Sequence, residues 1–288
     1  MKSTFIITFL LALISFDAIS QKRTLNDLEK NKIRGRVNLI EQETFKVKEH
    51  FGEIIKVALE GKENTWYNEK GYITKNSGFS NSRLFFDDDS LFNYSYQYDR
   101  LNNLTEQNSY KSDGSLETKD IYKYDDKGNQ VEQNFYKADG TLNMKTLRQF
   151  DTMGNKKVEN YYYSNGEWIK KIIYNYDEMG NLIEEDETQE YNKGELRFTN
   201  KYSYDKKNNL IDKKSYINGE LNNSCSSTYK YDEKGNITEE RSFTLDDAAY
   251  TNTYVYKFDE KGNWIVSTVF RGFAPIQITE RRIIYYPN

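Results

Sequence analysis

The chain has 288 residues, of which 41 are Lys or Arg and 45 are Asp or Glu, so its formal net charge is −4. Basic and acidic residues are interspersed along the chain without a cluster of Lys and Arg, which argues against a nucleic-acid partner. Aromatic residues make up 15% of the chain, which argues against disorder. Because His50 is the only histidine, Ser-His-Asp and Cys-His catalysis and histidine-ligated zinc are disfavoured. We predict no enzyme activity, catalytic residue, cofactor or metal site.

Residues 1–20 have the features of a secretory signal peptide. Lys2 supplies the positive charge, Phe5 to Phe16 form the apolar region, and the stretch ends with small residues around Ile19. We therefore predict cleavage between Ser20 and Gln21. The mature protein is expected in the periplasm, in the medium or on the cell surface.

Residues 21–34 are polar and are predicted to form a tether, with a short frayed helix around Leu25 and Leu28 as the alternative. Residues 35–92 show strand-like alternation and one degenerate copy of the repeat described next, from Trp66 to Gly71. They are predicted to be divergent N-terminal strands that cap the sheet. No later segment is apolar enough to span a bilayer, so we predict a chain that is not membrane-spanning.

From residue 93 onward, one motif dominates the chain. Seven times an aromatic residue is followed by Asp, two variable residues, Gly or Asn, and Asn, with successive Asp residues 26 to 28 positions apart. A fixed period of this kind indicates a repeat architecture. The pairs of Asp and Gly or Asn are Asp99 and Asn102, Asp125 and Gly128, Asp151 and Gly154, Asp177 and Gly180, Asp205 and Asn208, Asp232 and Gly235, and Asp259 and Gly262.

The motif is typical of a hairpin turn. Asp at the first corner accepts a hydrogen bond from the backbone two residues on, and the fourth position needs a positive φ. Gly adopts that conformation without strain and Asn tolerates it best among the others, which matches all seven copies. We predict that these residues are structural turn residues and not a ligand site.

A second turn signal, such as Asp139-Gly140 or Asn165-Gly166, lies midway between most successive motifs. Each repeat then contains two strands, and tight turns between strands permit only antiparallel neighbours. The predicted fold class is all-β. We expect residues 93–288 to form an up-and-down meander of hairpins, in one elongated, curled or solenoid-like sheet with closing strands at its C-terminal end.

Alternation within the strands places aromatic side chains on one face of this sheet. Arg148 replaces the expected tyrosine in one copy. Two interpretations remain open: the face is a core buried by curling of the sheet, or it is an open binding face. The residues of the possible binding face are Tyr122, Tyr124, Tyr174, Tyr176, Tyr202 and Tyr204.

With Tyr174, Tyr176, Asp177, Gly180, Asn181 and Leu182, the fourth copy resembles the tyrosine–aspartate (YD) repeat of the Rhs family. The resemblance covers about residues 93–270 and implies a hairpin sheet and a surface-associated, extracytoplasmic protein. Asn stands after Gly where the larger relatives often have Arg. The polar, Asn- and Lys-rich style is similar to small exported proteins of Bacteroidetes. The large relatives build a toxin-enclosing shell, for which this chain has too few strands.

Two functions follow as hypotheses. The first is an exported, non-enzymatic repeat scaffold that binds an unidentified protein or glycan at the cell surface. The alternative is an accessory or shell fragment of a polymorphic, Rhs-type toxin system.

Overall fold

The computed structural model describes residues 25–80, 90–191, 194–222, 226–243 and 249–287. The predicted signal peptide and its cleavage position between Ser20 and Gln21 lie outside these ranges. Within them, no helix is long and apolar enough to cross a membrane.

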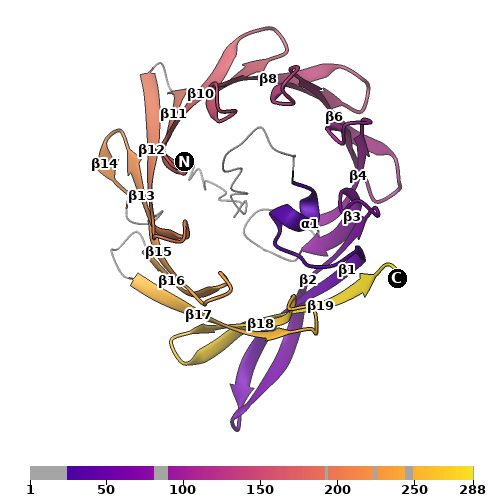
Figure 1. Cartoon of the computed structure of the whole chain (residues 1–288), viewed down its shortest axis with the longest axis vertical. Helices are drawn as coiled ribbons and strands as arrows, with labels where there is room; N and C mark the ends of the chain where they lie inside the picture. Colours follow the sequence, from indigo (N-terminus) through magenta and orange to yellow (C-terminus); the bar gives the residue numbers. More distant parts are fainter. Residues whose placement is uncertain (1–24, 81–89, 192–193, 223–225, 244–248, 288) are drawn as a thin grey trace, which may run out of the picture.

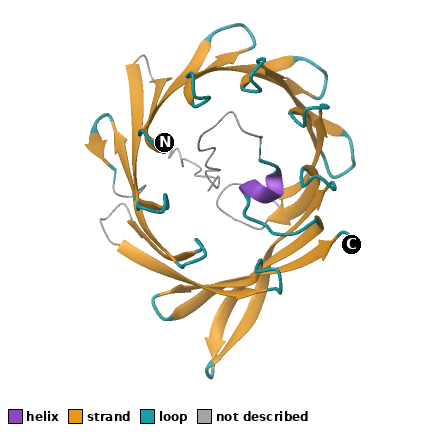
Figure 2. Ribbon diagram, in the orientation of Figure 1, coloured by secondary structure: helices purple, strands orange, loops and turns teal. Residues whose placement is uncertain are grey.

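One short helix precedes a continuous series of antiparallel strands (Figure 2). The elements are α1 (Asp27–Lys30), β1 (Val37–His50), β2 (Glu53–Tyr67), β3 (Ile73–Ser80), β4 (Ser90–Tyr98), β5 (Leu104–Tyr110), β6 (Leu116–Tyr124), β7 (Gln130–Lys137), β8 (Leu142–Phe150), β9 (Lys156–Tyr163), β10 (Trp168–Tyr176), β11 (Leu182–Tyr191), β12 (Gly194–Tyr204), β13 (Leu210–Ile217), β14 (Glu220–Leu221), β15 (Ser227–Tyr231), β16 (Ile237–Phe243), β17 (Ala249–Phe258), β18 (Trp264–Arg271) and β19 (Ala274–Tyr285).

The sheet closes on itself. β1 pairs with β2 along one edge and with β19 along the other, from Val37↔Tyr285 to Lys46↔Gln277. The two-residue β14 and β15 both pair with β13 and share one place in the wall. The nineteen described strands therefore form a closed antiparallel β-barrel with eighteen strand positions, seen end-on in Figure 1.

The predicted all-β, antiparallel class is confirmed, but the open, elongated, curled or solenoid-like sheet is wrong. A closed barrel has no free sheet edge along its wall, and the accumulated twist and coil of the strands carries the last strand back to the first. Residues 37–80 supply three strands of this wall, and β1 is the strand that closes it.

Up-and-down connectivity sends alternate turns to opposite ends of the barrel. The seven motif turns and the related turn at residues 68–72 lie at one end, which we call the motif rim. The turn at residues 51–52 and those at 111–114, 138–140, 163–166 and 271–273 lie at the other end, the far rim. In the end-on view, one set of turns lies inside the ring of strands and the other projects outside it (Figure 2).

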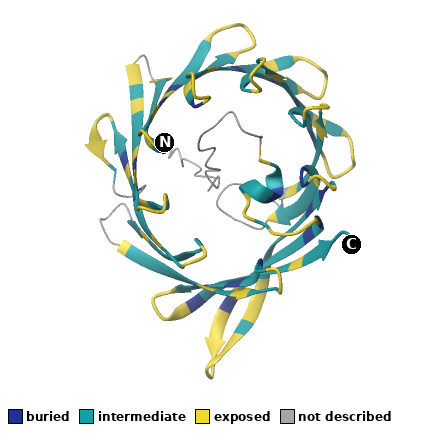
Figure 3. Cartoon of the chain, viewed as in Figure 1, coloured by how far each residue is buried: buried dark blue, intermediate teal, exposed yellow. Residues whose placement is uncertain are grey.

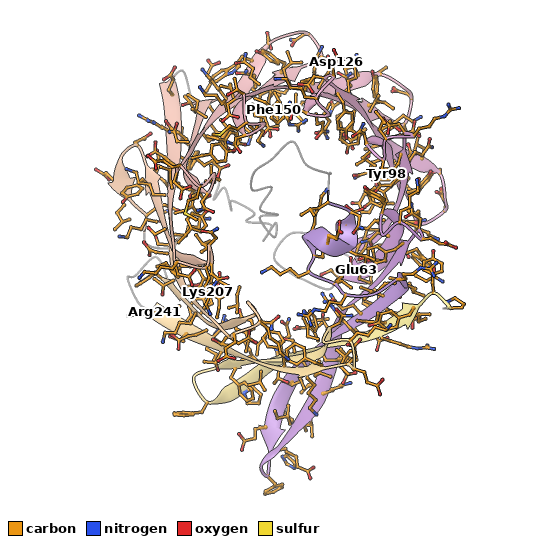
Figure 4. All side chains as sticks on the ribbon, in the orientation of Figure 1. Glu63, Tyr98, Asp126, Phe150, Lys207 and Arg241 are labelled. Carbon is orange, nitrogen blue, oxygen red and sulfur yellow. The ribbon has the colours of Figure 1, made fainter. Side chains whose placement is uncertain are left out.

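Helix α1 identifies the inner face of the wall, because it lies inside the ring (Figure 1). Leu28 of this helix is buried in a small core with Val37, Ile40 and Tyr67. Figure 4 places Tyr98, Phe150 and Glu63 on the inner side of the wall and Arg241 on the outer side. Figure 3 shows that much of the wall is only partly buried.

Candidate functional site: the inner face of the barrel

The seven motif turns share one geometry. The fourth residue has a φ between +62° and +86° in every copy. In the Asp177 copy, the carboxylate Oδ1 accepts from the backbone N–H groups of Met179 (2.9 Å) and Asn181 (2.8 Å), and Oδ2 accepts from the side-chain amide of Asn181 (2.9 Å). The Asp and the final Asn of the motif thus clamp the turn from both sides.

These turns hold their carboxylates in the ionised form. The pKa of Asp177 is lowered: burial alone would raise it, but the hydrogen bonds from Asn181 and the backbone outweigh that effect. Asp205 also has a lowered pKa, first because of the side-chain hydrogen bond from Asn209. With both carboxylate oxygens engaged in the turn, the motif aspartate is a structural anchor.

In most motifs, the tyrosine directly before the Asp forms a hydrogen bond with the preceding repeat. The hydroxyl of Tyr124 donates to the carbonyl of Leu104 (2.8 Å), and the hydroxyl of Tyr204 donates to the carbonyl of Leu182 (2.7 Å). Each acceptor directly follows the motif asparagine of the preceding turn. The same bond is made by Tyr176 to Lys156 and by Tyr231 to Leu210.

The tyrosine two positions earlier in the strand instead forms a hydrogen bond with a polar side chain on the inner face. Tyr122 donates to Gln107 (3.3 Å), Tyr174 to Glu159 (2.8 Å) and Tyr202 to Glu185 (2.8 Å). All six residues of the predicted aromatic face therefore face the interior of the barrel. Tyr174 and Tyr202 are buried, and the other four are half-buried.

Arg148 occupies the position of the missing tyrosine and connects two repeats. Its Nε donates to Glu159 (2.5 Å) and its Nη2 donates to Gln133 (2.8 Å). Lys156 also donates to Glu159 (2.8 Å) and lies 4.3 Å from the ring centre of Tyr174. Although 3% exposed, Glu159 stays ionised. Burial alone would raise its pKa, but Lys156, Arg148 and the Tyr174 hydroxyl lower it to about 2.

The inner face already holds a piece of polypeptide, because residues 26–36 are fastened to it at the motif rim. Asp27 accepts from the backbone N–H of Ile73 (2.7 Å) and from the hydroxyl of Tyr98 (3.1 Å). Farther along, the backbone of Arg34 exchanges two hydrogen bonds with the side chain of Asn263 (2.7 and 2.9 Å). This segment therefore bridges the wall on both sides of the β1–β19 junction.

The outer face has a different chemistry. Its cross-strand neighbours are oppositely charged, as in Lys119 with Glu106 (3.1 Å), Lys123 with Glu132 (2.8 Å) and Lys230 with Glu239 (2.8 Å). Such exposed pairs contribute about 0–1 kcal/mol each. Their significance is that they mark the outer face of these strands as hydrated.

The motif pattern did not reveal two features of this site. The final motif asparagine was not assigned its clamping role, although its presence in all seven copies was the available signal. The pairing of Arg148 with Glu159 was also missed, although the replacement of Tyr by Arg in a single copy was visible.

Among the described residues, no group of three or more His, Cys, Asp or Glu side chains could hold a metal ion.

No family model matches the chain, and no curated protein matches it. The similar solved structures include a porin-like protein from Bacteroides uniformis, with 13% identity over 86% of this chain and 98% of that chain and a TM-score of 0.44. A TcdB2-TccC3-TEV structure has 10% identity over 82% of this chain and a TM-score of 0.29. A TcdB2-TccC3 structure without its hypervariable C-terminal region has 12% identity over 80% of this chain and a TM-score of 0.29.

The chain spans 15% of the length of each TcdB2-TccC3 protein. At these identities and TM-scores, the similarities carry no functional argument.

Proposed function

We propose that this chain is an exported, non-enzymatic scaffold whose inner wall binds a polypeptide segment of a partner protein. The observation that carries the proposal is the docking of residues 26–36 on that wall. A carboxylate meets a tyrosine hydroxyl and a backbone N–H there, and Leu28 packs into an apolar cluster with residues of the wall. The same kinds of group, tyrosine rings beside Gln, Glu and Arg, continue around the wall beyond this segment.

The difference between the two faces supports the inner wall as the binding surface. Ion pairs such as Lys123 with Glu132 and Lys230 with Glu239 lie on the outer face of several strands, and hydrated pairs of this kind gain little from desolvation. The inner face instead presents aromatic area, which supplies most of the binding energy in protein interfaces. An exported protein with aromatic side chains concentrated on its inner wall is suited to holding a guest inside.

A glycan is the second candidate guest. Tyrosine rings flanked by carboxylate and amide side chains, as in Tyr202 beside Glu185, suit stacking and hydrogen bonding to sugars. The alternative role as an accessory or shell fragment of an Rhs-type toxin system uses the same inner wall, with a toxin segment as the guest. A toxin gene beside the gene for this chain would favour that role.

Site-specific photocrosslinking tests the proposal, because neighbouring residues of β12 face opposite ways. Tyr204 is half-buried on the inner face and Ser203 is exposed on the outer face. A photoreactive phenylalanine derivative at position 204 should crosslink to a polypeptide in the native exported fraction, and the same group at position 203 should not. Equal crosslinking from both positions, or none from position 204, would show that the inner wall is not the binding surface. Binding of the purified chain on a glycan array, without protein crosslinks, would favour the glycan.

A further inference from the structure

The β1–β2 hairpin extends beyond the wall of the barrel. β1 and β2 pair as far as His50↔Glu53, whereas the pairing of β1 with β19 ends at Lys46↔Gln277 and that of β2 with β3 ends at Gly61↔Ser80. Among the described residues, the two strands of residues 47–60 therefore pair only with each other and form an arm, whose Lys56 makes an ion pair with Glu280 of β19 (2.7 Å). Figure 1 shows this arm projecting from the ring.

The tip of the arm carries a residue that its turn does not favour. Phe51 has a φ of +49° and Gly52 a φ of +82°, the signs of a two-residue type I′ turn. Asn is preferred at the first of these positions because bulky side chains are strained there. The Phe51 side chain is 95% exposed, and its ring contacts the ring of the neighbouring His50. Neither turn chemistry nor packing accounts for phenylalanine here.

A second exposed phenylalanine lies on the adjacent hairpin. Phe273, in the turn between β18 and β19, is 100% exposed. Lys46 and Gln277 lie opposite each other, and the chain runs five residues from Lys46 to Phe51 and four from Gln277 back to Phe273. Both rings on the far rim are therefore reached from this last shared strand pair by similar lengths of chain, about 13–17 Å at the rise of a strand. Two separate hairpin tips end in an apolar side chain.

Addition of a partner strand to the arm does not explain these rings. The β2 edge of the arm is irregular, because the pairing register shifts between Thr44 and Phe45 and again between Lys46 and Val47. Bulges of this kind blunt a strand edge against further pairing. Contacts made by the arm should therefore use its side chains, chiefly Phe51 and the partly exposed Ile54 and Val57.

We propose that the far rim docks on a lipid surface by inserting Phe51 and Phe273 into its interface. Tyr163, 54% exposed, lies on the same rim at the end of β9, eight strand positions around the ring from β1. A flat lipid surface can contact rings on separate hairpins without preformed pockets, whereas a protein partner would need a matching pocket for each. Aromatic side chains are the favoured residues at the membrane–water interface.

Charge contributes little to this contact. On the arm, Lys48 and Lys56 are offset by Glu49, Glu53 and Glu60, so the arm has no excess of positive charge. Attraction should therefore come from apolar insertion, and binding should depend weakly on salt and on anionic lipid. A surface that bound through lysine alone would show the opposite behaviour.

Flotation of the full chain with lipid vesicles tests the proposal. Vesicles of phosphatidylcholine, with and without phosphatidylglycerol, should carry the protein upward in a density gradient. F51N and F273N should each lower the vesicle partition coefficient at least about tenfold, and the double variant more. F51N is a useful probe because Asn suits the turn, so lost binding would not reflect lost folding.

The matched control lies on the motif rim, where Leu101 is 78% exposed. L101N should float as the wild type does. Three outcomes would overturn the proposal: a wild-type chain that fails to float, as expected if the rings serve a protein pocket; a L101N loss equal to that of F51N; or binding that persists in the double variant and disappears in salt.

Discussion

The two rims of the barrel are built on different principles. At the motif rim, each of seven turns is held by an Asp that accepts from its own backbone and a Gly or Asn at positive φ. At the far rim, Asp113 and Asp139 hold their turns in a related way, with a Ser or Thr hydroxyl as the side-chain donor in place of the motif Asn, whereas the strained Phe51-Gly52 turn departs from this pattern. The motif rim is therefore the more uniform end of the barrel, and the less uniform far rim can carry exposed groups with a function.

Acidification should affect the motif rim most, because its seven aspartates titrate together. Each has a pKa below its usual value. Since the unfolded value is about 3.9, their stabilisation is complete above about pH 5 and is lost as the pH falls through the lowered pKa values. Denaturant unfolding across this range should show a steep loss of stability below pH 4. Constant stability from pH 5 to pH 3 would contradict the clamp.

The next largest effect is expected for Gly180→Val. Gly180 has a φ of +82°, and a β-branched residue there should cost about 2–3 kcal/mol of unfolding free energy. Gly180→Asn should cost about 1 kcal/mol or less, since Asn208 already has a φ of +62° at the equivalent position. Thermal unfolding of the two variants measures the difference, and equal shifts would mean that backbone conformation is not the constraint.

Asp177→Ala should destabilise the protein by about 1–2 kcal/mol, because three donors lose a charged acceptor at a partly hydrated turn. The far-rim counterpart is Asp139→Ala, which removes an acceptor for two donors of Thr141. Its effect should be smaller. Chemical denaturation of both variants tests the ranking, and a larger loss for Asp139→Ala would reverse the proposed difference between the rims.

The smallest effect is expected for Phe51→Asn. Because the side chain is exposed and its φ is positive, Asn should leave stability unchanged or raise it by up to about 1 kcal/mol. Differential scanning calorimetry of the variant and the wild type measures the sign of this change in stability. A clear loss of stability would show that Phe51 packs against the protein, and would remove the basis for assigning it to an external contact.

Several elements of this structure could be predicted from local residues. The positions of the hairpin turns follow from the spacing of Asp and Gly or Asn, since a positive φ restricts which residues fit. The common direction of Tyr122, Tyr174 and Tyr202 follows from two-residue alternation in a strand. The helix around Leu28 was the alternative to a tether, and its capping by Asn26 and Glu29 is again a local pattern.

Other elements could not be predicted in this way. The pairing of Arg148 with Glu159 depends on which residues of β8 and β9 lie opposite each other. The bond from Arg34 to Asn263 joins residues 229 positions apart. The extension of the β1–β2 arm beyond the wall depends on where the neighbouring strands stop.

Turn chemistry and strand alternation act over a few residues, so the local sequence specifies an all-β chain of antiparallel hairpins with one aromatic face and one polar face. The closure of this ribbon into a barrel with its tyrosines inside is a property of the whole fold. Closure depends on the summed twist of many strands and on the pairing of β1 with β19, and no single repeat carries either property.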